Sequence, residues 1–312
     1  MREDFCAFIL THGRPDKVHT FRTLQRHGYT GKVFIVIDDE DEDGEEYKRI
    51  YGDDVLVFSK DEVGRYTDQF DNFSDRRTIL WARNACWDLA KQMGYRYFIQ
   101  LDDDYYGFSH KRAGKAHRLN ISTEEEYHEW KISSLDAVFE ALVKLVETTS
   151  VTTIALSQGG DHQNRGGLLQ RFRRKAMNSF VCSVAKPIRF QGRLNEDVNT
   201  YVSLGRVGVL FFTDYKIMLH QLQTQSNSGG ISEVYREFGT YVKSFYTVMT
   251  APSCTTINTM GNKNRRLHHR INWRKAVPLI IPEQVQSSVS IEPTVNSSPL
   301  VETPPSKMAE SK

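Results

Sequence analysis

Three consecutive aspartates, Asp102, Asp103 and Asp104, follow the apolar run "YRYFIQL" that begins at residue 95. Carboxylates this close repel one another and resist burial unless water or a cation offsets their charge. Mg²⁺ and Mn²⁺ commonly bind one or two protein carboxylates, with water and phosphate oxygens at the other positions. On an extended backbone Asp102 and Asp104 would point to the same side and could share one ion. An exposed turn is the alternative interpretation.

A second acidic pair, Glu196 and Asp197, lies in the segment "LNEDVN". A positioned carboxylate can take the proton of an attacking hydroxyl group, which is general-base chemistry. Asn195 suggests a simpler explanation, because an asparagine at a helix N-cap would leave both acids in the first turn, where they favour the helix dipole. The pair therefore indicates either a catalytic base or the start of a helix.

Alternating strand and helix patterns must position these acids. Apolar runs of strand length begin at residues 5, 32, 55, 95 and 151. Residues at helical spacing lie between them, around 18–24, 79–90 and 135–146, and the second of these helices should stop at Gly94. This alternation predicts an α/β fold in which helices flank a mostly parallel central sheet.

Polar segments follow three of the predicted strands. They are "THGRPDK" from residue 11, "DDEDEDGEE" from residue 38 and "DDDYYGF" from residue 102. In open α/β sheets ligands bind beyond the carboxyl ends of the strands. We therefore expect these segments to share one site at that edge of the sheet.

Composition divides the chain into a globular part, residues 1–282, and a tail, residues 283–312. The tail is rich in Ser, Pro, Val and Glu and lacks aromatic residues, which predicts disorder. Within the globular part, the glycine-rich polar segment "GGDHQNRGG" at 159–167 is typical of a mobile loop over a site.

The cysteines and the hydropathy indicate a cytoplasmic protein. Cys6, Cys86, Cys182 and Cys254 lie far apart without a CxxC pair, so we expect buried, reduced thiols. No apolar stretch approaches the roughly 20 residues that a membrane-spanning helix needs, so no membrane partner is expected.

The overall charge indicates no particular binding partner, because 41 Lys and Arg residues nearly balance 39 Asp and Glu residues. Basic residues nevertheless cluster in "HKRAGKAHR" from residue 110, "RFRRK" from 171 and "NKNRRLHHR" from 262. Each cluster alone could be a solvated surface, and the presence of three clusters weakens that interpretation.

The segment "WARNACWDLAKQMGYRYFIQLDDD" resembles the pattern of GT-A glycosyltransferases, in which an Arg-Asn pair on a helix precedes a strand that ends in a DxD metal motif. Within that superfamily, "THGRPDK", "LDDDYYGF" and "GRLNEDVNTYVSLGRVG" are most similar to the TET-associated glycosyltransferases. The resemblance implies a GT-A fold and an enzyme, chiefly known from bacteriophages, that glycosylates 5-hydroxymethylcytosine in DNA. For a phage-encoded enzyme, the expected location is the host cytoplasm.

Carried over by position, the resemblance implies a role for each matching residue. The donor, a nucleotide-diphosphate sugar such as a UDP-sugar, would meet Thr11, Arg14, Asp38, Asp39 and Arg83. Mn²⁺ or Mg²⁺ would be held by Asp102 and Asp104, with His268 or His269 as a further contact. Asp197 or Glu196 would be the catalytic base.

Three other functions compete with this hypothesis. The same fold could act on a polysaccharide, a lipid-linked sugar or a protein, and it would then form no stable DNA complex. A nucleotidyltransferase fits the "THGRPDK" segment poorly, because that class opens with a glycine-rich nucleotide loop. A non-enzymatic DNA-binding protein would keep its DNA affinity without the acidic cluster.

Overall fold

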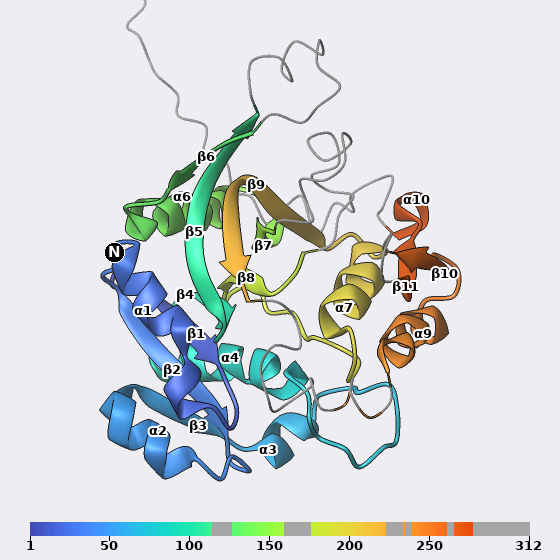
Figure 1. Cartoon of the computed structure of the whole chain (residues 1–312), viewed down its shortest axis with the longest axis horizontal. Helices are drawn as coiled ribbons and strands as arrows, with labels where there is room; N and C mark the ends of the chain where they lie inside the picture. The colour runs from blue at the N-terminus through green and yellow to red at the C-terminus, as the bar shows by residue number, and fades with distance from the viewer. Residues whose placement is uncertain are drawn as a thin grey trace, which may run out of the picture.

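The computed structural model describes residues 1–113, 127–158, 176–222, 239–260 and 265–276, together with Val234 and Glu237. It contains a nine-stranded sheet and a separate two-stranded ribbon (Figure 1). The strands of the large sheet are β1 (Phe5–Leu10), β2 (Lys32–Asp38), β3 (Val55–Phe58), β4 (Tyr97–Asp102), β5 (Tyr105–Ala113), β6 (Tyr127–Lys131), β7 (Val151–Ser157), β8 (Ser179–Ser183) and β9 (Leu210–Gln221). The helices associated with it are α1 (His19–Arg26), α2 (Gly44–Tyr51), α3 (Lys60–Gly64), α4 (Leu80–Gln92), α6 (Leu135–Thr148) and α7 (Glu196–Gly205), and two 3₁₀ turns are η1 (Pro15–Lys17) and η2 (Gly52–Asp54).

The large sheet has the strand order β3-β2-β1-β4-β8-β7-β9-β5-β6. Strands β3, β2, β1 and β4 run parallel, and β7 is parallel to β9. Strand β8 is antiparallel to both of its neighbours, and β5 and β6 extend the sheet as antiparallel strands. The predicted α/β sheet with flanking helices is confirmed, and its continuous parallel part is the part that binds ligands in folds of this class.

Helices cover both faces of the central strands. In β1, Phe8 packs into a core that includes residues of α4 and α7, and Ile9 packs into a core that includes residues of α1 and α6. Successive side chains of a strand point to opposite faces, so a strand covered on both faces must be apolar throughout. This is why the runs at 5, 32, 95 and 151 are almost continuously hydrophobic.

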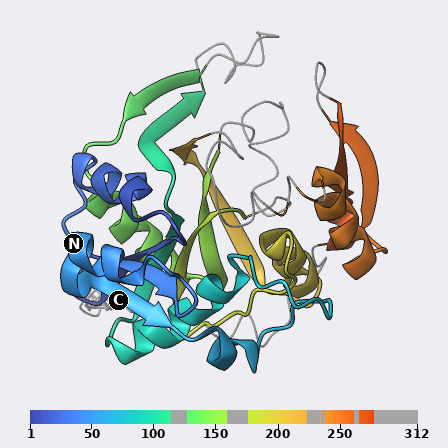
Figure 2. The same ribbon diagram turned by 60° about the horizontal axis from the view of Figure 1, so that its bottom comes forward.

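A C-terminal unit follows the large sheet in the chain. We define it as α9 (Thr240–Thr250), β10 (Thr255–Met260), β11 (Arg266–Ile271) and α10 (Trp273–Ala276), in which β10 and β11 pair antiparallel. The unit lies beside α7, across the molecule from α2 (Figure 1). Figure 2 shows the same separation after rotation, with the ribbon at the outer side of the unit.

Other expectations can be compared with these elements. The strands expected from residues 5, 32, 55, 95 and 151 are confirmed as β1, β2, β3, β4 and β7. Helix α4 ends before Gly94, whose φ of +80° suits glycine at a helix end. All four cysteines are buried and unpaired. Within the described part of the chain, no helix combines the length and the apolar character needed to cross a membrane. The predicted loop at 159–167 and the predicted tail at 283–312 lie outside the described residues.

Candidate active site

Arg83 connects the two acidic groups that the sequence singles out. It lies in α4, and its side chain is only 1% exposed. Nη2 lies 3.0 Å from Oδ1 of Asp102, and Nε lies 3.0 Å from Oε1 of Glu196. Asp102 ends β4 and Glu196 begins α7, so a single side chain joins a strand end and two helices.

Burial and like charges oppose ionisation of the two acids. Burial and the charges of Asp103 and Asp197 raise the pKa of Asp102, while Arg83 acts against this rise. Burial and Asp197 likewise raise the pKa of Glu196, again against Arg83. Burial also disfavours the guanidinium, yet the two acids raise the pKa of Arg83 overall. The acids and the arginine therefore stabilise each other's charged forms in a site that would reject any one of them alone.

Asp103 joins this strand end to the first loop. Thr11 Oγ1 donates a hydrogen bond to Asp103 Oδ2 at 2.6 Å, and Arg14 Nη2 lies 3.0 Å from the same oxygen. The Tyr47 hydroxyl contacts Thr11 Oγ1 at 3.0 Å and accepts the backbone N–H of Arg14 at 2.8 Å. The structure thus brings the predicted donor residues Thr11 and Arg14 together, and it assigns both of their side chains to holding Asp103.

The backbone around the aspartates differs from the prediction. Strand β4 ends at Asp102, and residues 103–104 form the turn into β5, so the three acids do not share one extended strand. Thr20 holds this turn, because its hydroxyl donates to the Asp102 carbonyl at 2.6 Å and accepts the Tyr105 N–H at 3.0 Å. The alternation argument for Asp102 and Asp104 is therefore wrong, and their relation depends on the turn.

The surroundings of the Asp104 carboxylate are suited to a bound cation. Its Oδ1 is buried and has no hydrogen-bond partner among the described residues. Burial together with Asp102 and Asp103 raises the pKa of Asp104 to about 7. An unpartnered carboxylate oxygen beside two further acids fits a hard divalent cation, which would supply the missing partner and offset the repulsion. Asp102 fits the same role, since Arg83 bonds only its Oδ1.

The two histidines do not join these aspartates as metal ligands. His268 and His269 lie on β11 with ring centroids 4.3 Å apart. His269 is buried, and its Nδ1 lies 3.3 Å from Nδ2 of Asn195. Over the residues that the structure describes, no group of three or more His, Cys, Asp or Glu side chains could hold a metal. Two aspartates and two histidines are therefore not gathered into one group among the described residues, and His269 contacts Asn195 instead.

The start of α7 positions the acidic pair. Asn195 has left-handed backbone angles, φ 56° and ψ 41°, and its side chain makes no capping hydrogen bond. Nδ2 instead donates to the Lys243 carbonyl at 2.7 Å and to Thr247 Oγ1 at 3.0 Å, both in α9. Side-chain capping by Asn195 is thus wrong, although both acids do lie in the first turn of α7. Asp197 is 8% exposed.

The acids after β2 differ from each other in their surroundings. His12 Nδ1 lies 2.8 Å from Oδ2 of Asp38, and Lys60 Nζ lies 2.7 Å from its Oδ1. Burial alone would raise the pKa of Asp38, but these two partners lower it overall. Asp39 is exposed, and its Oδ1 accepts the backbone N–H of Lys60 at 3.0 Å. Asp38 is therefore an anchored anion at the predicted nucleotide edge, and Asp39 is the more accessible acid.

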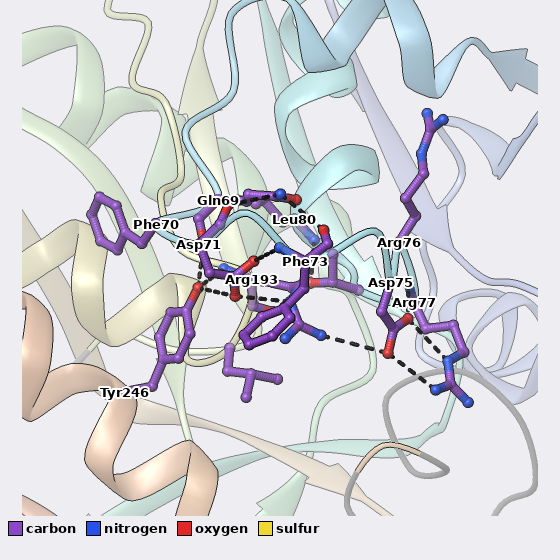
Figure 3. A network of polar contacts seen from close by, with 12 residues as sticks. Gln69, Phe70, Asp71, Phe73, Asp75, Arg76, Arg77, Leu80, Arg193 and Tyr246 are labelled. Carbon is purple, nitrogen blue, oxygen red and sulfur yellow. Dashed lines mark hydrogen bonds and ion pairs between the residues drawn. The ribbon is translucent and has the colours of Figure 1, made fainter.

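A polar network beside α7 was missed from the sequence (Figure 3). Asp71 Oδ2 accepts hydrogen bonds from Arg193 Nε at 3.0 Å and from the Tyr246 hydroxyl at 2.8 Å. Arg193 Nη1 also lies 3.6 Å from Oδ2 of Asp75, and Asp75 pairs with Arg77. The network ties the loop before α4 to α9 and fixes the chain two residues before Asn195. No local pattern could have found it, because Asp71 and Arg193 are 122 residues apart.

The structure describes only part of the aromatic and basic segments that the sequence analysis named. Tyr105 and Phe108 are buried in the core, whereas Tyr106 is 52% exposed. Of the three basic clusters, the structure describes residues 110–113 and 265–270, and the cluster at 171–175 lies outside the described residues.

Comparison with protein families gives the class of this chain. Residues 5–230 match the model of the TET-associated glycosyltransferases. The matched range includes the Arg83 network, the three aspartates and the start of α7. The chain is therefore a glycosyltransferase. It belongs to the TET-associated glycosyltransferase family, as its motifs suggest.

Solved structures also show similarity. Glucosyl-3-phosphoglycerate synthase from Mycobacterium tuberculosis, in complex with Mg²⁺ and UDP, matches with a TM-score of 0.44 and 9% identity over 91% of this chain and 92% of that chain. The same enzyme with Mn²⁺, UDP and phosphoglyceric acid matches with a TM-score of 0.44 and 10% identity over 91% of each chain. No curated protein matches the sequence.

Proposed function

We propose that this glycosyltransferase moves a sugar from a nucleotide-diphosphate donor, such as a UDP-sugar, to the hydroxyl of 5-hydroxymethylcytosine in DNA. The observation that carries the proposal is the buried Arg83, which bonds Asp102 and Glu196 at 3.0 Å each. This contact joins the acids at the strand end, suited to the donor, to the acids at the start of α7, suited to the acceptor. Membership of the family supports the modified cytosine as acceptor.

On the donor side, Asp102 and Asp104 would hold Mn²⁺ or Mg²⁺, since their carboxylates include the unpartnered buried oxygen of Asp104. When bound, the cation supplies positive charge to the departing diphosphate. Arg83 adds a fixed positive charge at the same place. Thr11 and Arg14 hold Asp103 and thereby the turn, and Asp38 and Asp39 provide acceptors for the base or ribose of the nucleotide.

On the acceptor side, we assign the base to Asp197. Glu196 is held in an ion pair with Arg83, so its carboxylate serves to orient that guanidinium. Asp197 follows directly in the first turn of α7, and its Oδ1 accepts the N–H of Val198 at 2.7 Å. Its carboxylate would take the proton of the cytosine hydroxymethyl group as the new glycosidic bond forms. We place the enzyme in the cytoplasm, in keeping with its four buried, unpaired cysteines.

The test is a transfer reaction with Mn²⁺, a panel of nucleotide sugars and duplex DNA that contains 5-hydroxymethylcytosine. After digestion, mass spectrometry of the nucleosides should show a gain of one sugar on the modified cytosine only. Chelation of the metal or the variant Asp104→Asn should abolish this gain. The exposed acid Glu140 on α6 provides the matched control, and Glu140→Gln should transfer like the wild type.

A different acceptor would give a different result. Release of nucleoside diphosphate that depends on Asp104, without any sugar on the modified cytosine, would reject DNA as the acceptor. Transfer that is unaffected by Asp104→Asn and by chelation would reject the assigned metal site.

A further inference from the structure

The C-terminal unit contains basic residues and no acidic ones. No Asp or Glu occurs between Glu237 and Glu283. The same stretch contains Lys243, Lys263, Arg265, Arg266, Arg270, Arg274 and Lys275. This unit also lies beyond the family match, which ends at residue 230. Its charge therefore calls for an explanation separate from the catalytic residues.

The cations of the ribbon and of α10 are exposed. Arg265, Arg266, Arg270, Arg274 and Lys275 all have exposed side chains. None of them forms a salt bridge with a residue that the structure describes, in contrast to Arg14 and Arg83. The unit itself supplies no carboxylate, so among the described residues no acid offsets this positive charge.

The ribbon presents part of this charge on one face. Arg266 and Arg270 lie four residues apart on β11 and therefore share a face. His269 points toward Asn195, and the ring of His268 lies against the ring of His269, with centroids 4.3 Å apart. On β10, the exposed Thr256 lies opposite Arg270, and the exposed Asn258 lies opposite His268. We call this the outer face of the ribbon. It combines guanidinium groups with further hydrogen-bond donors, which is the chemistry that recognises phosphate oxygens.

The opposite side of the C-terminal unit contacts Asn195, the residue that precedes the acceptor-side acids Glu196 and Asp197. Asn195 bonds Lys243 and Thr247 of α9 and lies 3.3 Å from His269 of β11. Asn195 directly precedes Glu196. A macromolecule bound to the ribbon would therefore be held on the element that positions the proposed base.

We propose that the outer face of the β10–β11 ribbon binds the phosphate backbone of the acceptor DNA. This inference rests on the proposed function and adds the surface that holds the substrate. Duplex DNA carries one negative charge per about 1.7 Å of its axis, so the exposed arginines of the ribbon complement it. An anionic membrane is the competing partner, because Tyr241, Phe245 and Met249 form an exposed apolar stripe on α9. The outer face of the ribbon favours DNA, since Thr256 and Asn258 accompany its arginines in place of large apolar side chains.

The experiment compares the full-length wild type with the double variant Arg266→Ala/Arg270→Ala. Fluorescence anisotropy measures the binding of a labelled duplex at several salt concentrations. Loss of two phosphate contacts should lower the salt slope by about 1.8, so the ratio of wild-type to variant affinity should fall about 12-fold between 50 and 200 mM salt. An unchanged slope in the variant would overturn the inference.

The matched control is Lys48→Ala/Arg49→Ala on α2. This variant also removes two exposed cations, but each of them pairs with a glutamate of the same helix. Its salt slope should equal that of the wild type. An equal decrease in both double variants would indicate a nonspecific charge effect and would overturn the assignment to the ribbon. The last comparison measures binding to vesicles that contain phosphatidylserine. If the ribbon arginines were needed for binding to these vesicles and the protein did not bind the duplex, the assignment of the ribbon to DNA would be rejected.

Activity separates this inference from the proposed function. In the Arg266→Ala/Arg270→Ala variant, donor hydrolysis and transfer to the free 5-hydroxymethyldeoxycytidine nucleoside should stay at the wild-type level, while KM for the duplex rises. Wild-type transfer to duplex DNA with an unchanged KM in the variant would reject the ribbon and keep the function. Absence of transfer by the wild type would reject the function, and the anisotropy slope would still decide whether the ribbon binds DNA.

Discussion

The arginines at the sheet edge and those in the C-terminal unit differ in what surrounds their charge. Arg83 is buried and bonds two carboxylates, and Arg14 is held against Asp103. Arg266 and Arg270 are exposed and have no salt bridge to a described residue. The first pair neutralises acids within the chain, whereas the second pair leaves its charge available to another molecule.

This difference separates two uses of the same residue type. A buried arginine between acids holds a fixed geometry, because each unpaired charge would be costly in a site with little water. An exposed arginine contributes little to folding but attracts anions. The comparison therefore predicts that changes at the sheet edge affect chemistry and stability, and that changes in the ribbon affect DNA binding alone.

The largest expected effect is on chemistry at the sheet edge. Asp197→Asn should lower kcat by about 10²–10⁴-fold, since a general base contributes that much to a proton transfer. Arg270→Ala should leave kcat on the free modified nucleoside unchanged. Initial rates at saturating donor and saturating acceptor give both kcat values. A variant Asp197→Asn with near wild-type kcat would remove Asp197 from the role of base.

The second largest difference between the two regions should appear in the free energy of unfolding. Arg83→Met leaves Asp102 and Glu196 without their cation and should lower the free energy of unfolding by about 3–5 kcal/mol. Arg270→Met makes the same change at an exposed position and should alter it by no more than about 0.5 kcal/mol. Urea unfolding of both variants provides the measurement. Similar losses in both would break the distinction between paired and unpaired arginines.

A smaller effect is expected where the two regions meet. Asn195→Ala removes the hydrogen bonds to Lys243 and Thr247 and places alanine at a φ of 56°, so it should cost about 1–3 kcal/mol. Asn195→Gly loses the same bonds but relieves the backbone, so it should be the milder of the two. Asn258→Ala on the outer face is the exposed control. Thermal unfolding should rank the three variants in this order, and an equal effect of Asn195→Ala and Asn258→Ala would show that the junction contributes no stability.

The smallest effect should be pH-dependent and confined to the paired region. The hydrogen bond to Asp38 raises the pKa of His12. The pair therefore contributes stability that is complete below the unfolded pKa of about 6.5 and is lost as pH rises through the higher folded value. Because His12 is 40% exposed, the contribution should stay below about 1 kcal/mol. Urea unfolding should show a larger deficit for His12→Gln at about pH 5.5 than at about pH 8.5. A deficit that is independent of pH, or one matched by the exposed His110→Gln, would contradict the role of this pair.

The sequence by itself determined five of the strands, β1, β2, β3, β4 and β7, and the positions of the acids. Strands that are covered on both faces must be apolar throughout, so β1, β2, β4 and β7 could be recognised from short windows of residues. Polar segments after parallel strands had to meet at one edge, which placed Thr11, Asp38 and Asp102 together. Glu196 and Asp197 were expected at a possible helix start, and they do begin α7.

Only the tertiary structure decided how these residues are paired. The turn after β4, the two bonds of Arg83 and the contact of His269 with Asn195 join residues that are distant in the chain or depend on a local backbone angle. The ribbon arginines, which pair with no acid of the described residues, belong to the same category. A basic cluster has the same sequence pattern whether acids from another element neutralise it or not. Such pairings follow from how elements pack, and packing brings together side chains whose spacing in the sequence carries no periodic signal.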